Sequence, residues 1–87
     1  MREAYIVAAV RTACGKRNGR LSAVHPVDLG AAVVDELLDR TALPADAVED
    51  VIFGCVTKVG AQAGNIGRNV ALASRLDVSV PGVTIDR

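Results

Sequence analysis

The stretch Val51-Ile52-Phe53-Gly54-Cys55-Val56 decides the fold, because it is a continuous apolar run and not an alternating one. Continuous runs are typical of strands that are covered on both faces, as in a parallel sheet. A similar run occupies residues 5–10, and residues 80–85 indicate a further strand, whose start is loosened by Pro81 and Gly82. The sequence therefore predicts three buried strands.

Two amphipathic segments alternate with these strands. The first begins at Pro26, which suits the first turn of a helix, carries Asp28 near its start and ends near Thr41. Its apolar stripe recurs at three- and four-residue spacing, with a polar set facing away: Val27, Gly30, Ala31, Val34, Leu37 and Leu38 against Asp35, Glu36, Asp39 and Arg40. The second follows Asn65, an expected N-cap, and continues toward Arg75. A short helical turn is expected at residues 44–48.

The predicted order is β-α-β-α-β, which indicates an α/β fold with a mainly parallel sheet and right-handed crossovers. Three strands and two helices cannot cover both faces of such a sheet. We therefore expect residues 1–87 to leave apolar sheet surface open and to be an incomplete domain.

Composition excludes several functions. The formal net charge is zero and no apolar stretch approaches the roughly 20 residues of a membrane span, so neither nucleic acid nor a membrane is an expected partner. No signal peptide is evident, and a cytoplasmic location is expected. A local basic group in residues 11–20 is interpreted as a solvated loop, with an anion-steering rim as the alternative; its members are Arg11, Lys16, Arg17 and Arg20.

Candidate reactive groups are few. Cys14 and Cys55 are too far apart for a CxxC zinc site, and metal ligands are not expected. Cys14 has cationic neighbours and is the better nucleophile candidate, whereas Cys55 is expected to be a small apolar residue inside a strand. His25 precedes a helix and is interpreted as structural. The glycine-punctuated loop 60–65 lacks the spacing of a phosphate loop and is interpreted as a turn.

Five segments stand out when they are taken together and in order. They cover essentially the whole chain: Ile6 to Gly19 (an opening strand and R-T-x-x-G-x-x-x-G loop), Asp28 to Ala31, Val51 to Val56 (V-I-x-G-x-V), Asn65 to Arg68 (N-x-x-R) and Thr84-Ile85-Asp86-Arg87 (T-[VI]-[ND]-R). Together they resemble the start of the thiolase family. In the family the last segment leads, after one more residue, into the nucleophilic cysteine. The resemblance implies that residues 1–87 are the N-terminal part of a thiolase N-terminal domain, without the nucleophile or the C-terminal domain.

The resemblance also implies an activity. Thiolases move an acyl group between an enzyme cysteine and coenzyme A, either cleaving 3-ketoacyl-CoA or condensing acetyl-CoA, with no metal or redox cofactor. Their catalytic cysteines and histidines would follow Arg87, so no catalytic, cofactor-binding or metal-binding residue is expected within this chain. Expected partners are acyl-CoA and CoA, the remainder of the polypeptide (possibly as a separate chain), and further copies in a homodimer or homotetramer.

Two alternatives stay open. A small non-catalytic α/β module for binding or assembly would fold cooperatively as a monomer of 87 residues. Another condensing enzyme of the thiolase fold would share the architecture without cleaving 3-ketoacyl-CoA with CoA. Two features, Asp86-Arg87 and Gly54-Cys55, favour the degradative type of thiolase over the biosynthetic type.

Overall fold

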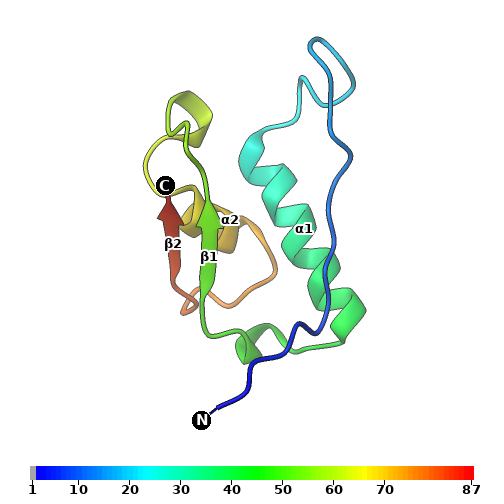
Figure 1. The fold of residues 1–87 in the computed structure, drawn as a ribbon, viewed down its shortest axis with the longest axis vertical. Coiled ribbons are helices and arrows are strands. Elements are labelled where there is room, and N and C mark those ends of the chain that lie inside the picture. The colour runs from blue at the N-terminus through cyan, green and yellow to red at the C-terminus, as the bar shows by residue number, and fades with distance from the viewer. Residues whose placement is uncertain (1) are drawn as a thin grey trace.

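The computed structural model describes residues 2–87 and contains two helices and two strands in alternation. They are α1 (Pro26–Thr41), β1 (Val51–Gly54), α2 (Ile66–Ala73) and β2 (Gly82–Ile85), with 3-10 turns at Ala45–Ala47 and Gly60–Gln62. The strands lie side by side and run in parallel, with Val51 opposite Gly82 and Gly54 opposite Ile85 (Figure 1). The predicted α/β class and parallel pairing are confirmed.

Helix α1 has the bounds that its sequence pattern predicts, Pro26–Thr41. Pro26 occupies its first turn, where a missing N–H costs no hydrogen bond, and the His25 side chain accepts a hydrogen bond from the Val27 N–H at 3.1 Å. The helix ends where Ala42 adopts a left-handed conformation with φ of 54°. Local signals at both ends therefore determine this element.

The core lies where α1 and α2 meet the inner face of the sheet. Val70 of α2 is fully buried, and a Cβ atom at Gly30 would lie 2.7 Å from its Cγ2 atom and 3.1 Å from Cζ of Phe53. The close approach of the helices thus requires glycine at position 30. A neighbouring part of the core is aliphatic. It consists of Leu38, Ala71, Leu76 and Val80, with Val34, Val48 and Val51 packed against it.

A polar connection joins the two helices at the end of α2. Asp35, one of the polar residues expected to face away from the apolar stripe, accepts a hydrogen bond from the Arg75 backbone N–H at 2.8 Å. The Arg75 guanidinium also contacts Asp39 at 2.6 Å, and the hydrogen bond and charge of Asp39 raise the pKa of Arg75. The helix ends at Ala73, so Arg75 lies beyond its last turn.

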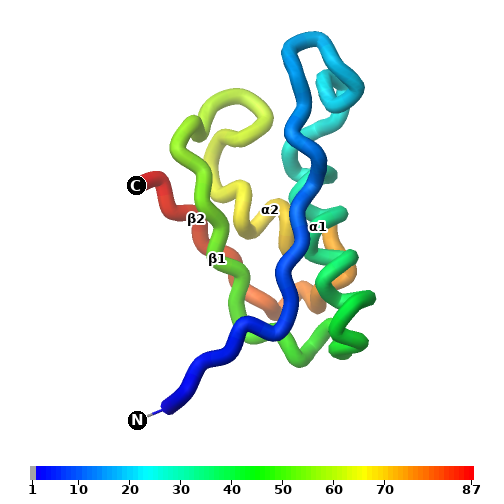
Figure 2. The backbone as a smooth tube through the Cα atoms, turned by 45° about the vertical axis from the view of Figure 1, so that its right-hand side comes forward, coloured from blue at the N-terminus to red at the C-terminus, as the bar shows by residue number. Residues whose placement is uncertain are grey.

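One face of the sheet is bare. Both helices lie on the same side of β1 and β2 (Figure 2), and burial alternates along each strand. On the opposite face Ile52, Val83 and Ile85 remain 67%, 43% and 51% exposed. We call these three residues the bare face. Since apolar side chains of neighbouring strands are left in water, the expected open sheet surface is confirmed.

The strand predicted at residues 5–10 is not formed, and this prediction was wrong. The segment is extended and runs alongside α1 (Figures 1 and 2), but it is outside the sheet, and Ile6 and Val7 are 92% and 79% exposed. A continuous apolar strand gains stability from cover on both faces. Within residues 2–87 the helices cover a single face, so the segment lacks that gain.

The two strands that do form are shorter than predicted. β1 ends at Gly54 instead of Val56, although the Cys55 N–H still donates to the Ile85 carbonyl at 2.9 Å. β2 starts at Gly82, because Pro81 has no N–H to contribute to a ladder. Their paired length is therefore four residues each.

We expect the isolated chain to self-associate through the bare face. Lysines at Ile52 and Val83 should increase the monomer fraction, since charge opposes stacking of apolar sheet surface. Sedimentation velocity would measure this, with lysines at Leu72 and Val78, which are exposed outside the sheet, as a matched control. A monodisperse wild-type monomer with a sharp thermal transition would contradict the expectation and support the non-catalytic module.

Candidate functional site

The carboxyl ends of β1 and β2 meet at one edge of the sheet, the edge where ligands of open α/β sheets usually bind. Cys55, Thr57 and Lys58 follow β1 there, and Asp86 and Arg87 follow β2. We call this the strand-end edge. It is the candidate site, because a thiol and several charged side chains lie close together there.

Cys55 lies just after β1 and not inside a strand, which corrects its predicted position. Its thiol donates a long hydrogen bond to the Thr57 carbonyl at 3.5 Å. The Gln62 amide is 3.6 Å from the sulfur and donates to the same carbonyl at 2.7 Å. These contacts hold the turn after β1 in place, and they bring no base to the Cys55 thiol.

An ion pair links the segments that leave the two strands. Lys58 Nζ lies 3.1 Å from Asp86 Oδ2. The hydrogen bond and charge of Lys58 lower the pKa of Asp86. Both groups are partly solvated, with 35% and 60% of their side chains exposed, so the pair contributes little stability. It does fix the two segments side by side.

A hydrogen-bonded cluster holds β2 against the first turn of α2. The Thr84 hydroxyl donates to Asn65 Oδ1 at 2.7 Å and accepts from the Gly67 N–H at 2.9 Å. The Asn65 amide also donates to the Gly82 carbonyl at 2.8 Å, and its oxygen caps α2 through the Arg68 N–H at 3.1 Å. We call Asn65, Gly67 and Thr84 the strand clamp. Asn65 is thus the N-cap that its position predicts.

The segment before β2 has a separate restraint. The Arg68 guanidinium donates to the carbonyls of Val80 at 2.6 Å and Val78 at 2.9 Å. Asn65 therefore acts on β2 itself, at Gly82 and Thr84, whereas Arg68 acts on the segment before the strand.

The loop 60–65 is a turn, as predicted, and not an anion site. Gly60 and Gly64 adopt positive φ of 58° and 71°, a backbone conformation that residues other than glycine rarely adopt. In the first turn of the helix that follows, the Gly67 and Arg68 N–H groups are already bonded to Thr84 and Asn65. No free donors of these two residues remain for a phosphate.

The other sequence candidates lie away from this edge. His25 caps α1, which agrees with its structural interpretation. Cys14 is exposed in the loop before α1, and the four basic residues of that loop are solvent-exposed and absent from the ion pairs of residues 2–87. The structure does not bring Cys14 and Cys55 together with a base among the described side chains.

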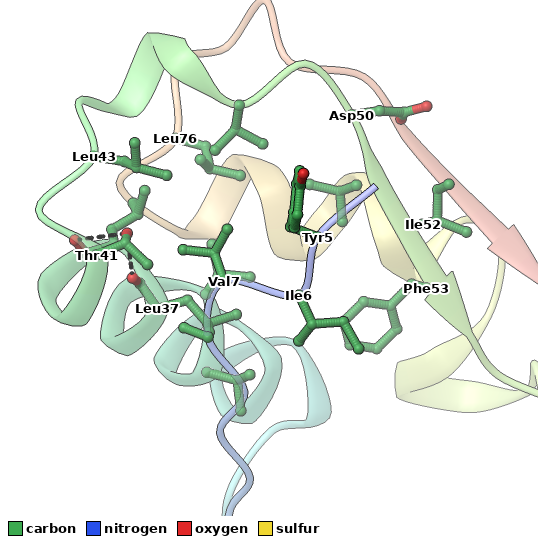
Figure 3. Close-up of a pocket in the computed structure, with 16 residues that line it drawn as sticks. Tyr5, Ile6, Val7, Leu37, Thr41, Leu43, Asp50, Ile52, Phe53 and Leu76 are labelled. Atoms are coloured by element: carbon green, nitrogen blue, oxygen red, sulfur yellow. Dashed lines mark hydrogen bonds between the residues drawn. The ribbon is translucent and has the colours of Figure 1, made fainter. Parts of the chain in front are cut away.

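An apolar hollow of 470 Å³ opens between residues 5–8, α1 and β1 (Figure 3). Figure 3 shows Tyr5, Ile6 and Val7 along one wall and Leu37 and Phe53 on others. The Thr41 hydroxyl at its margin is already bonded to the Leu37 carbonyl at 2.7 Å. Without converging polar groups the hollow offers no means to orient a ligand, and we interpret it as a packing gap.

Residues 2–87 offer neither a cluster of metal ligands nor a membrane-spanning helix. Among residues 2–87, no three His, Cys, Asp or Glu side chains lie close enough together to bind a metal ion. Neither described helix has the length and hydropathy needed to cross a bilayer.

Comparison with known proteins identifies the family. The profile described as the thiolase N-terminal domain matches residues 4–87. The chain belongs to the thiolase family. The predicted family is confirmed, and the clamp residues Asn65 and Thr84, together with Arg68, are members of the thiolase-like motifs N-x-x-R and T-[VI]-[ND]-R.

The curated relatives are bacterial thiolases. The chain is 58% identical over 87 residues to the steroid 3-ketoacyl-CoA thiolase FadA6 of Mycobacterium tuberculosis, of which it covers 21%. It is 42% identical to a β-ketoadipyl-CoA thiolase of Acinetobacter baylyi and 40% identical to a 3-ketoacyl-CoA thiolase of Bacillus subtilis, covering 22% of each. The chain therefore spans about a fifth of the length of these thiolases.

Sequence reasoning missed the interactions of Gln62, Lys58 and Thr84. Gln62 lies seven residues from Cys55, and Thr84 lies 19 residues from Asn65, so no local spacing connects them. Parallel pairing of the two predicted strands could have suggested the Lys58–Asp86 pair, because both residues closely follow strand ends.

If His25 only caps α1, His25→Ala in the complete thiolase should lower the free energy of unfolding by about 1 kcal/mol, the usual loss of a cap, and leave turnover unchanged. His25→Asn keeps a capping acceptor and should restore the stability. Urea unfolding and steady-state kinetics would measure both. Equal loss of turnover in the two variants, at wild-type stability, would assign chemistry to His25.

The Lys58–Asp86 pair predicts a pH response. Lys58→Met should raise the pKa of Asp86 toward its ordinary value, measured by NMR of isotope-labelled aspartate. Because the folded-state pKa is lowered, the pair stabilises the fold above the ordinary carboxyl range, and this is lost as pH falls through the lowered pKa. The control Arg40→Met removes a cation paired with Glu36 on α1 and should leave the pKa of Asp86 unchanged. If the pKa of Asp86 were unchanged in Lys58→Met, Lys58 would not be the cause of the lowered pKa.

Proposed function

We propose that the complete protein is a thiolase that cleaves 3-ketoacyl-CoA with CoA, and that residues 1–87 are its non-catalytic scaffold. The observation that carries the proposal is family membership along the whole chain, which ends in the thiolase-like segment Thr84–Arg87 at the strand-end edge. The substrate class rests on the names of the relatives, which include two 3-ketoacyl-CoA thiolases.

In the proposed reaction a cysteine that follows Arg87 supplies the nucleophile. Its thiolate attacks the 3-keto carbon of the substrate, the bond between C2 and C3 breaks, and the departing acetyl-CoA carbanion takes a proton. The thiol of a second CoA then gives up its proton and attacks the acyl-enzyme thioester, so that the shortened acyl-CoA leaves and the cysteine thiolate is restored. The released proton balances the one that the acetyl-CoA carbanion takes up. No net oxidation occurs and no redox cofactor is needed.

The chain's part in this reaction is to aim the nucleophile. A thiol placed where β2 runs on into a helix would lie at a helix N-terminus, which stabilises a thiolate and supplies N–H donors for an oxyanion. The remaining polypeptide would cover the bare face and supply the histidines and second cysteine expected from the resemblance. We further propose a cytoplasmic homodimer or homotetramer, which light scattering of the complete protein would test.

Thiolysis by the complete protein tests the proposed function. Purified protein should consume acetoacetyl-CoA or a longer 3-ketoacyl-CoA in a CoA-dependent way and release acetyl-CoA, measured by chromatography of the CoA esters. The isolated chain of 87 residues is the control and should be inactive. Absence of CoA-dependent cleavage for every chain length would refute the thiolase assignment and favour another condensing enzyme of this fold.

A further inference from the structure

We propose that Thr84 and Asn65 are positioning residues for the acyl transfer, because together they set the direction in which the chain leaves β2. This inference rests on the proposed function, in which the nucleophilic cysteine stands two positions after Arg87. Neither residue touches the substrate in this proposal. They act through the strand that carries the nucleophile.

The strand clamp has a single hydrogen-bonding arrangement. The Asn65 amide nitrogen donates to the Gly82 carbonyl at 2.8 Å, so its oxygen must face the Thr84 hydroxyl. Because that oxygen accepts from Thr84, the hydroxyl oxygen is left to accept from the Gly67 N–H at 2.9 Å. Exchanging the amide oxygen and nitrogen would bring two oxygens together at Gly82. The clamp therefore holds β2 in one position relative to α2.

Direct backbone contact between α2 and β2 further restricts movement of the strand along the helix. A Cβ atom at Gly67 would lie 2.6 Å from the Val83 carbonyl oxygen, and one at Gly82 would lie 2.7 Å from the Arg68 nitrogen. The helix backbone thus touches the strand backbone directly, without side chains that could adjust. β2 cannot slide along α2 without breaking the hydrogen bonds of the clamp.

The distance between the clamp and the proposed nucleophile makes small errors matter. An extended chain advances about 3.3 Å per residue, so a tilt of about 5° at Thr84 would displace an atom ~15 Å further on by more than ~1 Å. A misplacement of about 1 Å can reduce turnover ~100-fold. Loss of the clamp should therefore reduce turnover more than it reduces substrate binding.

Variants of the clamp and of Arg68 separate an effect on the position of the nucleophile from an effect on the stability of the fold. Thr84→Val keeps the side-chain volume but loses both hydrogen bonds of the hydroxyl, and Thr84→Ser keeps them. Asn65→Ser keeps an N-cap acceptor for α2 but is too short to reach Gly82 and Thr84 together. Arg68→Met releases the segment before β2, at Val78 and Val80, and is the matched control.

The experiment uses the complete protein with acetoacetyl-CoA and CoA. Thr84→Val and Asn65→Ser should each lower kcat about 10- to 100-fold with KM within about twofold, and the pH profile of thiol alkylation should move to higher pH. Thr84→Ser should restore wild-type kcat. Arg68→Met should lower the thermal midpoint with kcat within about twofold, since the clamp still holds β2 at Gly82 and Thr84.

Three results would overturn the inference. Wild-type kcat in folded Thr84→Val or folded Asn65→Ser would show that the clamp does not position the nucleophile. Equal loss of kcat in Arg68→Met, with the alkylation profile unchanged in all variants, would reduce the clamp to a stabilising role. If the wild-type protein cleaves no 3-ketoacyl-CoA, the proposed function fails, which is seen before any variant is measured and removes the basis of the inference.

Discussion

The structure depends on direct contact between the backbones of α2 and β2. A side chain at Gly67 or Gly82 would meet main-chain atoms of the other element at 2.6 to 2.7 Å, so both positions need glycine. Asn65 and Thr84 then connect the two elements with hydrogen bonds. Since β1 pairs with β2 and α1 packs on α2, the placement of every other element follows from this contact.

The same contact explains why the sheet is covered on one side. With α2 pressed against the inner face, α1 packs against α2 on the same side of the sheet, and the bare face keeps Ile52, Val83 and Ile85 in water. Free energy from burial is available on the inner face alone, where Val70 is fully enclosed. A chain with this layout is suited to be one layer of a larger domain, which agrees with its coverage of about a fifth of its thiolase relatives.

The predictable parts of the fold are those with local signals. Pro26 and three- to four-residue spacing gave the bounds of α1, and an asparagine at a glycine-rich boundary predicted the N-cap of α2. The strand predicted at residues 5–10 was wrong, because an apolar run indicates which side chains could be buried but not whether a surface to cover them is present. The register that places Lys58 beside Asp86, and the pairing of Asn65 with Thr84, depend on tertiary contacts that no local pattern encodes.

In the proposed function, residues 1–87 hold in place a nucleophile that follows Arg87. Mapping the acyl-enzyme tests this most directly. The complete protein would be incubated with a 3-ketoacyl-CoA without free CoA, quenched in acid and digested, and the acylated peptide identified by mass spectrometry. We predict the acyl group on a cysteine in the peptide that follows Arg87. Acylation of Cys14 or Cys55 would contradict the account.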